Sequence, residues 1–412
     1  MKITRPFLFL LVISVSSASE ITITRQVESS LSTRAGFDSH PTGTNGTIAA
    51  VPGGEDTLTF GVGANFGFSL SAAIPAKPAL KLTYAGEVVR FDGCPSENFI
   101  SHRFGLSGQF IAGAWKFSGE GSSLFVDGSS TTVITDSSMN ANAISLWRER
   151  RRQWQHRLKL QTQADFDTYV VRASGTLLVY DYHTQVVPGK IAFADRSDAQ
   201  GSVDLGRIQN PNSLWLGGFR VGRQNQATVP LPNCAFDYSN DYTRLAAGWE
   251  GKPCANTTVT FAAGPDFRHY TGAIDPRVFL GGRNRTSLWF EGGFVAKLSP
   301  TLTLTGKAGQ MDWLSSTGKS AYVDSGAETA AAWGLTPDWT LRFSAKVHRC
   351  EYFPAVRDDW ESLLGIGGTL KLSKNSLLTI DILRHQARNL IATFSGREFH
   401  RLVVSLGASI KL

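Results

Sequence analysis

The chain has 412 residues, 42% of them hydrophobic and 18% charged, with a formal net charge of +7. Its basic residues are dispersed, with "RERRR" at 148–152 as their one dense cluster, and this pattern disfavours a nucleic-acid partner more than a membrane surface or an anionic solute. Four widely spaced cysteines without a C-x-x-C pair disfavour a disulfide scaffold and a zinc site.

An export signal opens the chain. Lys2 and Arg5 lie around the start of an apolar run from Pro6 to Val15, and small residues follow up to Ser19. That run is about ten residues long, too short for the roughly 20 residues that a spanning helix requires. We therefore predict a cleaved signal peptide over residues 1–19 and a mature exported protein over residues 20–412, which also argues against nucleic-acid binding.

The mature chain is dominated by a repeat of two residues, which predicts β-strands whose two faces meet different environments. In "WTLRFSAKVH", Leu341, Phe343 and Val347 lie on one face, while Arg342 and Lys346 lie on the other. The segments "SLWFEGGFVAKLS" and "RLVVSLGASIKL" alternate in the same way. Each strand thus has an apolar side and a polar side.

The connections alternate between tight turns and longer polar loops rich in Gly and Pro, as in a membrane barrel with short periplasmic turns and long outer loops. Eight tight turns and nine long loops imply 18 strands and place both ends of the mature chain on one side. The hairpin around 201–222 has a short, polar first strand. If this hairpin is not counted, the predicted barrel has 16 strands. Predicted strands start near residues 28, 55, 79, 99, 114, 153, 168, 201, 213, 241, 257, 285, 301, 321, 339, 360, 377 and 399.

A sheet in hydrocarbon must close on itself, because each unpaired backbone group there costs several kcal/mol. Aromatic side chains beside the predicted tight turns fit an interfacial girdle. A soluble β-sandwich or β-helix would need one very large dry core, or several domains for which no linker is visible. The predicted fold class is therefore all-β: a transmembrane antiparallel up-and-down β-barrel. The girdle residues are Trp115, Phe166, Tyr169, Trp249, Trp333 and Trp339.

The stretch "WLSSTGKSAY" at 313–322 contains a Gly-Lys-Ser that resembles the end of a phosphate-binding loop. Such a loop needs a glycine five residues before its Gly-Lys, and Trp313 occupies that position. We interpret the stretch as a loop that joins two strands.

The runs "SNDYTRLAAGWEGKP", "GPDFRHYTG" and "WLSSTGKSAYVDS", together with the alternating C-terminal segment, resemble an uncharacterised porin-like family of outer-membrane β-barrels of Gram-negative bacteria. This resemblance covers nearly the whole mature chain and implies a place in the outer membrane. The implied partners are membrane lipid, lipopolysaccharide and the barrel-assembly machinery, and no biochemical activity follows. The chain ends in Leu412, whereas such barrels usually end in Phe or Trp.

If the apolar faces meet lipid, the opposite faces line a lumen in which basic residues outnumber acidic ones. Because Arg and Lys in a pore favour anions, we predict a passive channel for small hydrophilic solutes with a mild anion preference. The alternative for each of these basic residues is that it forms salt bridges that stabilise the barrel wall, or that it lies in water near a rim. The lumen-facing candidates are Lys81, Arg103, Arg157, Lys159, Arg172, Lys297, Lys307, Arg342, Lys346 and Arg401.

Other interpretations stay open. The loop 127–151 is a candidate constriction, with its arginines at 148 and 150–152 facing either the pore or the outer leaflet. A plugged or structural barrel is the main alternative to a channel. A barrel-embedded hydrolase, using Asp358 or Asp359 with His348, or Asp181 with His183, is a weaker one. Neither a cofactor nor a metal is predicted, the oligomeric state is open, and Cys94 and Cys234 form either a bridge or free thiols.

Overall fold

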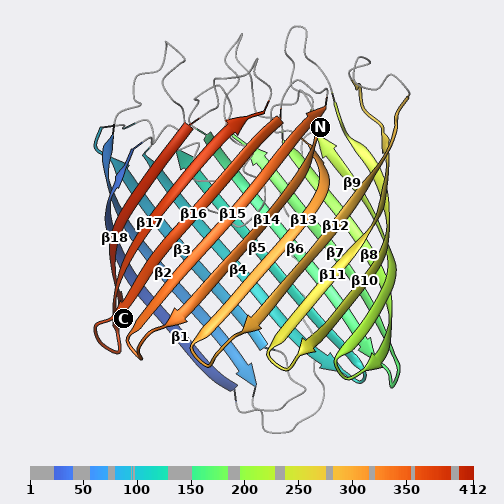
Figure 1. Cartoon of the computed structure of the whole chain (residues 1–412), viewed down its shortest axis with the longest axis horizontal. Coiled ribbons are helices and arrows are strands. Elements are labelled where there is room, and N and C mark those ends of the chain that lie inside the picture. The colour runs from blue at the N-terminus through green and yellow to red at the C-terminus, as the bar shows by residue number, and fades with distance from the viewer. Residues whose placement is uncertain are drawn as a thin grey trace.

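The structure is a computed structural model, and it shows one closed antiparallel sheet of 18 strands (Figure 1). Among the described residues, no helix is long and apolar enough to span a membrane. The described residues are 23–39, 56–72, 79–93, 95, 98–128, 151–183, 195–227, 237–274, 282–314, 321–353, 358–390 and 399–412. The strands are β1 (Ile23–Asp38), β2 (Thr57–Ala72), β3 (Ala79–Phe91), β4 (Phe99–Ala112), β5 (Trp115–Gly128), β6 (Arg151–Asp165), β7 (Tyr169–Tyr182), β8 (Arg196–Asn210), β9 (Ser213–Gln226), β10 (Asn240–Cys254), β11 (Thr257–Tyr270), β12 (Asn284–Lys297), β13 (Leu302–Leu314), β14 (Ala321–Gly334), β15 (Trp339–Phe353), β16 (Asp358–Lys371), β17 (Ser376–Asn389) and β18 (Phe399–Lys411).

The sheet closes where the first strand meets the last. β1 pairs with β18 from Ser30 opposite Lys411 to Asp38 opposite Val403, and on its other side β1 pairs with β2 along its whole length. Every later strand is antiparallel to its neighbour in the chain. The sheet therefore has no free edge strand, which is the condition for a β-structure inside a bilayer. The predicted fold class is confirmed.

The strand number of 18 is confirmed, and the alternative of 16 is wrong because β8 and β9 form a full hairpin. Most predicted starts lie within two residues of the observed ones. The largest differences are at β1, which starts at residue 23 rather than 28, and at β8, which starts at 196 rather than 201. At β8 the reason is that Arg196, Asp198 and Gln200 face the interior, where they interact with other polar side chains, so they give the strand a loop-like composition.

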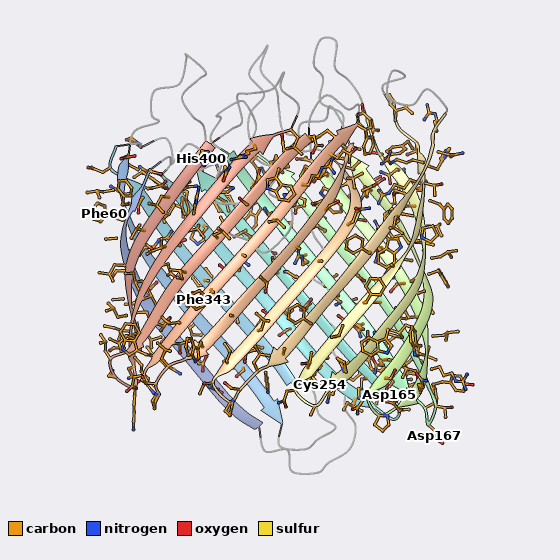
Figure 2. All side chains as sticks on the ribbon, viewed as in Figure 1. Phe60, Asp165, Asp167, Cys254, Phe343 and His400 are labelled. Carbon is orange, nitrogen blue, oxygen red and sulfur yellow. The ribbon has the colours of Figure 1, made fainter. Side chains whose placement is uncertain are left out.

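The outer surface of the barrel is apolar. Large hydrophobic side chains project outward around the wall, including Phe60 and Phe343, which Figure 2 labels. Soluble monomers rarely expose a contiguous apolar surface of this kind, so we assign this band to the lipid. Near the tight turns, Trp115, Phe166, Tyr169, Trp333 and Trp339 are exposed as predicted for a girdle, and Trp215, which was not predicted, is exposed as well. Trp249 is only partly exposed, because its indole N–H donates to the Ser213 hydroxyl at 2.8 Å.

Candidate functional site in the barrel interior

The inner wall of the barrel has two unlike regions. On β3–β6, which we call the open half, the inward side chains of Lys81, Arg157 and Lys159 are exposed to the lumen. On β7–β14, which we call the packed half, inward polar side chains toward the long-loop end, such as Arg244 and Asp266, are buried, whereas Lys297 and Lys307 nearer the short turns are exposed. The alternation that sends apolar residues outward is the same in both regions. The difference lies in what the inward side chains contact.

Buried charges in the packed half neutralise one another. The Nε of Arg244 and the Nη2 of Arg268 each donate to Asp266 Oδ2 at 2.8 Å. Arg268 also donates through Nη1 to Gln224 Oε1 at 2.9 Å and to Asn240 Oδ1 at 3.1 Å. Because a buried charge is tolerated only when it is paired and hydrogen-bonded, these contacts are what allow the guanidinium groups to be buried here.

At the long-loop end of the β13–β14 hairpin, β13 separates from β12, while β14 stays paired with β15. Pairing between β12 and β13 stops at Phe290 opposite Gln310, whereas β13 and β14 stay paired up to Leu314 opposite Ala321. In this part Asp312, Trp313 and Leu314 are all buried, with 1%, 7% and 2% of their surfaces exposed. A wall strand has one face toward lipid, so successive buried residues show that this end is enclosed by protein on both faces.

An aromatic cluster holds this hairpin end across the interior. Tyr180 of β7 packs with Trp313, Tyr322, Cys350 and Tyr352, which belong to β13–β15. Strands so far apart around the barrel can meet only through its interior, so the cluster closes the packed half at the long-loop end.

Arg196 at the start of β8 joins the same cluster. Its guanidinium carbon lies 4.4 Å from the ring centre of Tyr180 and 5.8 Å from that of Trp313, and its Nη1 donates to the carbonyl oxygen of Leu314. Such stacking is favourable for a guanidinium that has lost its water. Arg196 therefore ties β7 and β8 to the tip of the hairpin.

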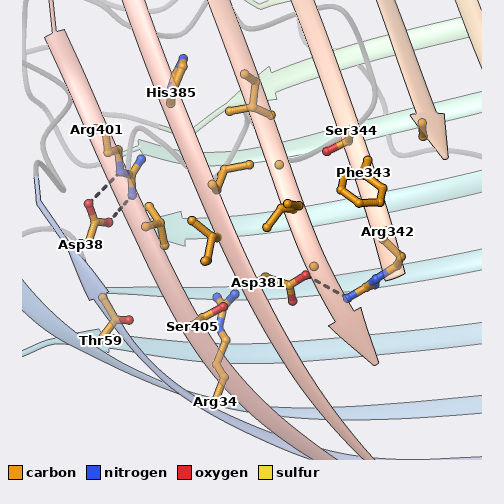
Figure 3. A pocket seen from close by; sticks show the side chains of 18 of the residues that line it. Arg34, Asp38, Thr59, Arg342, Phe343, Ser344, Asp381, His385, Arg401 and Ser405 are labelled. Carbon is orange, nitrogen blue, oxygen red and sulfur yellow. Dashed lines mark hydrogen bonds and ion pairs between the residues drawn. The ribbon is translucent and has the colours of Figure 1, made fainter. Parts of the chain in front are cut away.

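A cavity of about 630 Å³ is lined by residues of β1–β4 and β13–β18. Its lining combines apolar side chains with three arginine–carboxylate pairs, two of which are marked in Figure 3. The donor–acceptor distances are 2.8 Å for Arg34 Nη2 to Glu87 Oε1, 2.9 Å for Arg342 Nη2 to Asp381 Oδ1 and 2.9 Å for Arg401 Nε to Asp38 Oδ1.

Two of these pairs cross an intervening glycine. Arg34 of β1 reaches Glu87 of β3 over Gly61 of β2, where an added Cβ would lie 2.8 Å from the Arg34 side chain. In the same way, a Cβ at Gly367 of β16 would collide with Asp381. The glycines thus leave room for long side chains to lie flat along the inner wall.

The predicted lumen residues fall into two groups. Arg172 pairs with Glu250 at 2.7 Å and Lys307 with Glu328 at 2.7 Å, and Arg342 and Arg401 pair as described above. Within the described ranges, no carboxylate lies at ion-pair distance from the other group, and Arg103, an exposed residue of β4 that does interact with another residue, belongs to neither group. The members of this other group are Lys81, Arg157, Lys159, Lys297 and Lys346.

The residues considered for a hydrolase are not assembled into one site. His348 is paired with Asp324, whose Oδ1 lies 2.5 Å from its Nε2, while Asp358 accepts from Arg349 Nε at 3.0 Å. Asp181 and His183 form a half-exposed pair at 3.4 Å at the end of β7. Asp359 lies opposite Cys350 in the β15–β16 ladder. The cluster of Asp324, His348 and Cys350 was missed from the sequence, because nothing in the spacing reveals that β14 and β15 place these residues together.

Several predictions concern residues outside the described ranges: the signal peptide over 1–19, most of the loop 127–151 with the arginines at 148 and 150, the Gly-Lys-Ser at 318–320, and Cys94 with Cys234. The strands that flank the Gly-Lys-Ser stretch, β13 and β14, are joined as expected for a loop between strands.

A scan against family models finds no match, and no curated protein matches the chain. Among solved structures, it is similar to the siderophore receptor PiuA of Acinetobacter baumannii, with 10% identity, a TM-score of 0.44, and coverage of 96% of this chain and 82% of that one. OccK2 (OpdF) of Pseudomonas aeruginosa with glucuronate gives 11% identity, a TM-score of 0.43 and coverage of 94% and 98%. A BenF-like porin of Pseudomonas fluorescens Pf-5 gives 10% identity, a TM-score of 0.42, and coverage of 94% of this chain and 99% of that one. At these values the similarity supports no functional conclusion for this chain.

Proposed function

We propose that this chain is a passive channel of the bacterial outer membrane for small hydrophilic solutes, with a mild preference for anions. The observation that carries the proposal is the pairing of an apolar outer wall with an inner wall whose charged side chains on β3–β6 are exposed. Charged groups that are exposed on the inside of a closed barrel require water in the lumen, and a water-filled lumen lets small polar solutes pass.

The anion preference is proposed from the uneven charge of the open half. Lys81, Arg157 and Lys159 have no carboxylate within ion-pair distance among the described residues, and Glu120 is the exposed acid between them. Arg244, Arg268 and Arg285 of the packed half are neutralised by Asp266 and Asp312, so these arginines contribute little to the field in the lumen. A basic excess along a pore favours anions.

A plugged or structural barrel is the second candidate, and the aromatic cluster from β7 to β15 favours it. That cluster and the inward end of the β13–β14 hairpin reduce the open cross-section. The cavity shares β13–β15 with the cluster but extends to β1–β4, which contribute nothing to the cluster, and we place the passage on that side.

A hydrolase has weaker support. A catalytic His348 would have to reach both a nucleophile and a substrate, but its surface is only 3% exposed and its Nε2 is occupied by Asp324. The Cys350 thiol nearby is buried as well.

Planar-bilayer recording of the purified protein tests the proposal. A channel gives stable ohmic steps, and a plugged barrel stays silent at high protein load. In a salt gradient, the reversal potential should indicate anion preference. A cation-preferring value would reject the charge argument but leave the channel itself intact.

A further inference from the structure

Three metal-ligating side chains of different chemistry meet on the inner wall, near the long-loop end. They are Asp324 of β14 with His348 and Cys350 of β15, and their ligand atoms all lie within 4.8 Å of one another. The Nε2 of His348 is 2.5 Å from Asp324 Oδ1 and 3.7 Å from Cys350 Sγ. The residues are 2%, 3% and 4% exposed, so surrounding protein shields the group from solvent.

The register of the strands explains how this group forms. Asp324 lies directly opposite Cys350 in the β14–β15 ladder, and Asp359 lies directly opposite Cys350 on its other side, in the β15–β16 ladder. A row of carboxylate, thiol and carboxylate therefore crosses three strands on their inward face. His348 is two residues from Cys350 on the same face of β15, because side chains alternate with period two. Asp359 is also buried, but it does not belong to the group whose ligand atoms lie within 4.8 Å of one another.

The donor set selects among metals. Thiolate sulfur, imidazole nitrogen and carboxylate oxygen together are the ligands of Zn²⁺ and related ions, whereas Ca²⁺ and Mg²⁺ prefer oxygen alone. Ligands at zinc bond lengths in a tetrahedral site lie roughly 3.2 to 3.7 Å apart. The Sγ–Nε2 separation already fits this spacing, and the His348–Asp324 contact would open by roughly 0.7 Å to admit the ion.

Electrostatics favour the same occupant. A buried carboxylate lacks the stabilisation that water gives it, and a divalent cation supplies the opposite charge at low dielectric. On binding of the cation, the Cys350 thiol would release its proton to solvent and the thiolate would become a ligand, without any oxidation.

We propose that Asp324, His348 and Cys350 form a three-ligand binding site for a divalent ion of the zinc class. Cys350 also belongs to the aromatic cluster that packs on the β13–β14 hairpin. A bound ion would therefore brace the wall on which the hairpin end rests and stabilise the packed half. The proposal is independent of whether the barrel conducts.

The test is a titration of the folded full-length protein, stripped of metal by a chelator, with Co²⁺ in detergent. One equivalent of Co²⁺ should give a thiolate-to-cobalt charge-transfer band in the near ultraviolet, and Zn²⁺ should displace it. The background carries Cys94→Ser and Cys234→Ser, so that Cys254 and Cys350 are the remaining thiols. Cys350→Ser should abolish the band. The matched control is Cys254→Ser, which changes an exposed cysteine at the short-turn end, and it should leave the band intact (Figure 2).

Asp324→Asn and His348→Gln provide second variants, and each should weaken Co²⁺ binding by roughly tenfold or more. Zn²⁺ should also raise the urea midpoint of unfolding of the parent protein but not that of His348→Gln. Absence of the band in folded parent protein, or a band that persists in Cys350→Ser, would overturn the site. If Cys350→Ser fails to fold, unchanged Co²⁺ affinity in both Asp324→Asn and His348→Gln would overturn it equally.

Discussion

The open half and the packed half of the interior are built from strands of the same kind, yet they treat charge in opposite ways. Lys81 and Lys159 on β3 and β6 extend into the lumen, whereas Arg244 and Arg268 on β10 and β11 are buried against Asp266. The difference teaches that alternation decides only which side of the wall a residue faces. Whether an inward side chain is exposed to the lumen or buried depends on interaction partners that lie several strands away.

Side-chain contacts connect β12 and β13 in the part of the packed half where their backbone pairing ends. Above Phe290 the backbone ladder between these strands ends, and side chains connect them instead. Gln310 Nε2 donates to the Leu288 carbonyl at 2.9 Å, and Arg285 Nε donates to Asp312 Oδ2 at 2.9 Å. These contacts replace part of the lost backbone pairing, which would otherwise be costly near the bilayer.

The largest effect should follow the loss of a buried carboxylate. Asp266→Ala leaves Arg244 and Arg268 buried without their shared partner, and we expect a loss of about 3–5 kcal/mol in the free energy of unfolding. Urea titration of the barrel folded in lipid vesicles measures it. The control, Glu120→Ala in the open half, should change this free energy by no more than about 0.5 kcal/mol. Equal losses would remove the distinction between the two halves.

Removal of a clustered aromatic side chain should come next. Trp313→Ala should lower the free energy of unfolding by about 3 kcal/mol and raise single-channel conductance, because the hairpin end loses its contact with Tyr180. Trp215→Ala, at the outer surface, should cost about 1 kcal/mol and leave conductance unchanged. Unaltered conductance in Trp313→Ala would mean that the hairpin end does not limit the passage.

A smaller effect is expected at the ion pairs of the cavity. Arg342 and Asp381 are about half exposed, so Arg342→Ala should change the free energy of unfolding by less than about 1 kcal/mol. The same urea titration applies. A loss as large as that of Asp266→Ala would show that this side of the interior is packed too.

The smallest effect is expected from reversing one charge in the lumen, and it concerns ion selectivity. In Lys159→Glu the anion-to-cation permeability ratio should fall roughly twofold, because a screened charge in water acts weakly on a passing ion. Reversal potentials in a salt gradient measure this ratio. Lys374→Glu, in the tight turn between β16 and β17, makes the same charge change away from the lumen and should have no effect. Matching shifts in both variants would argue against selectivity within the lumen.

Much of the barrel could be predicted because its wall is a local pattern. Turn residues and alternating side chains mark each strand, and closure follows from the need to pair every backbone group in lipid. The start of β8 was placed too late because its first residues serve a polar network inside the barrel. The interior could not be predicted, since contacts such as Tyr180 with Trp313 join distant strands. One local signal was present: the doublets Trp313–Leu314 and Ala321–Tyr322 break the alternation where the hairpin turns inward.

The most direct test of the two-sided interior is the accessibility of a matched pair of engineered cysteines. Ser118 lies exposed on the inner wall of β5, and Ser202 lies buried on the inner wall of β8. Each is replaced by cysteine in a background with Cys94, Cys234 and Cys254 changed to serine, and conductance is followed during exposure to a charged thiol reagent. We predict rapid labelling and a conductance step for Ser118→Cys and no reaction for Ser202→Cys. Equal labelling at both positions would contradict an interior that is open on one side and packed on the other.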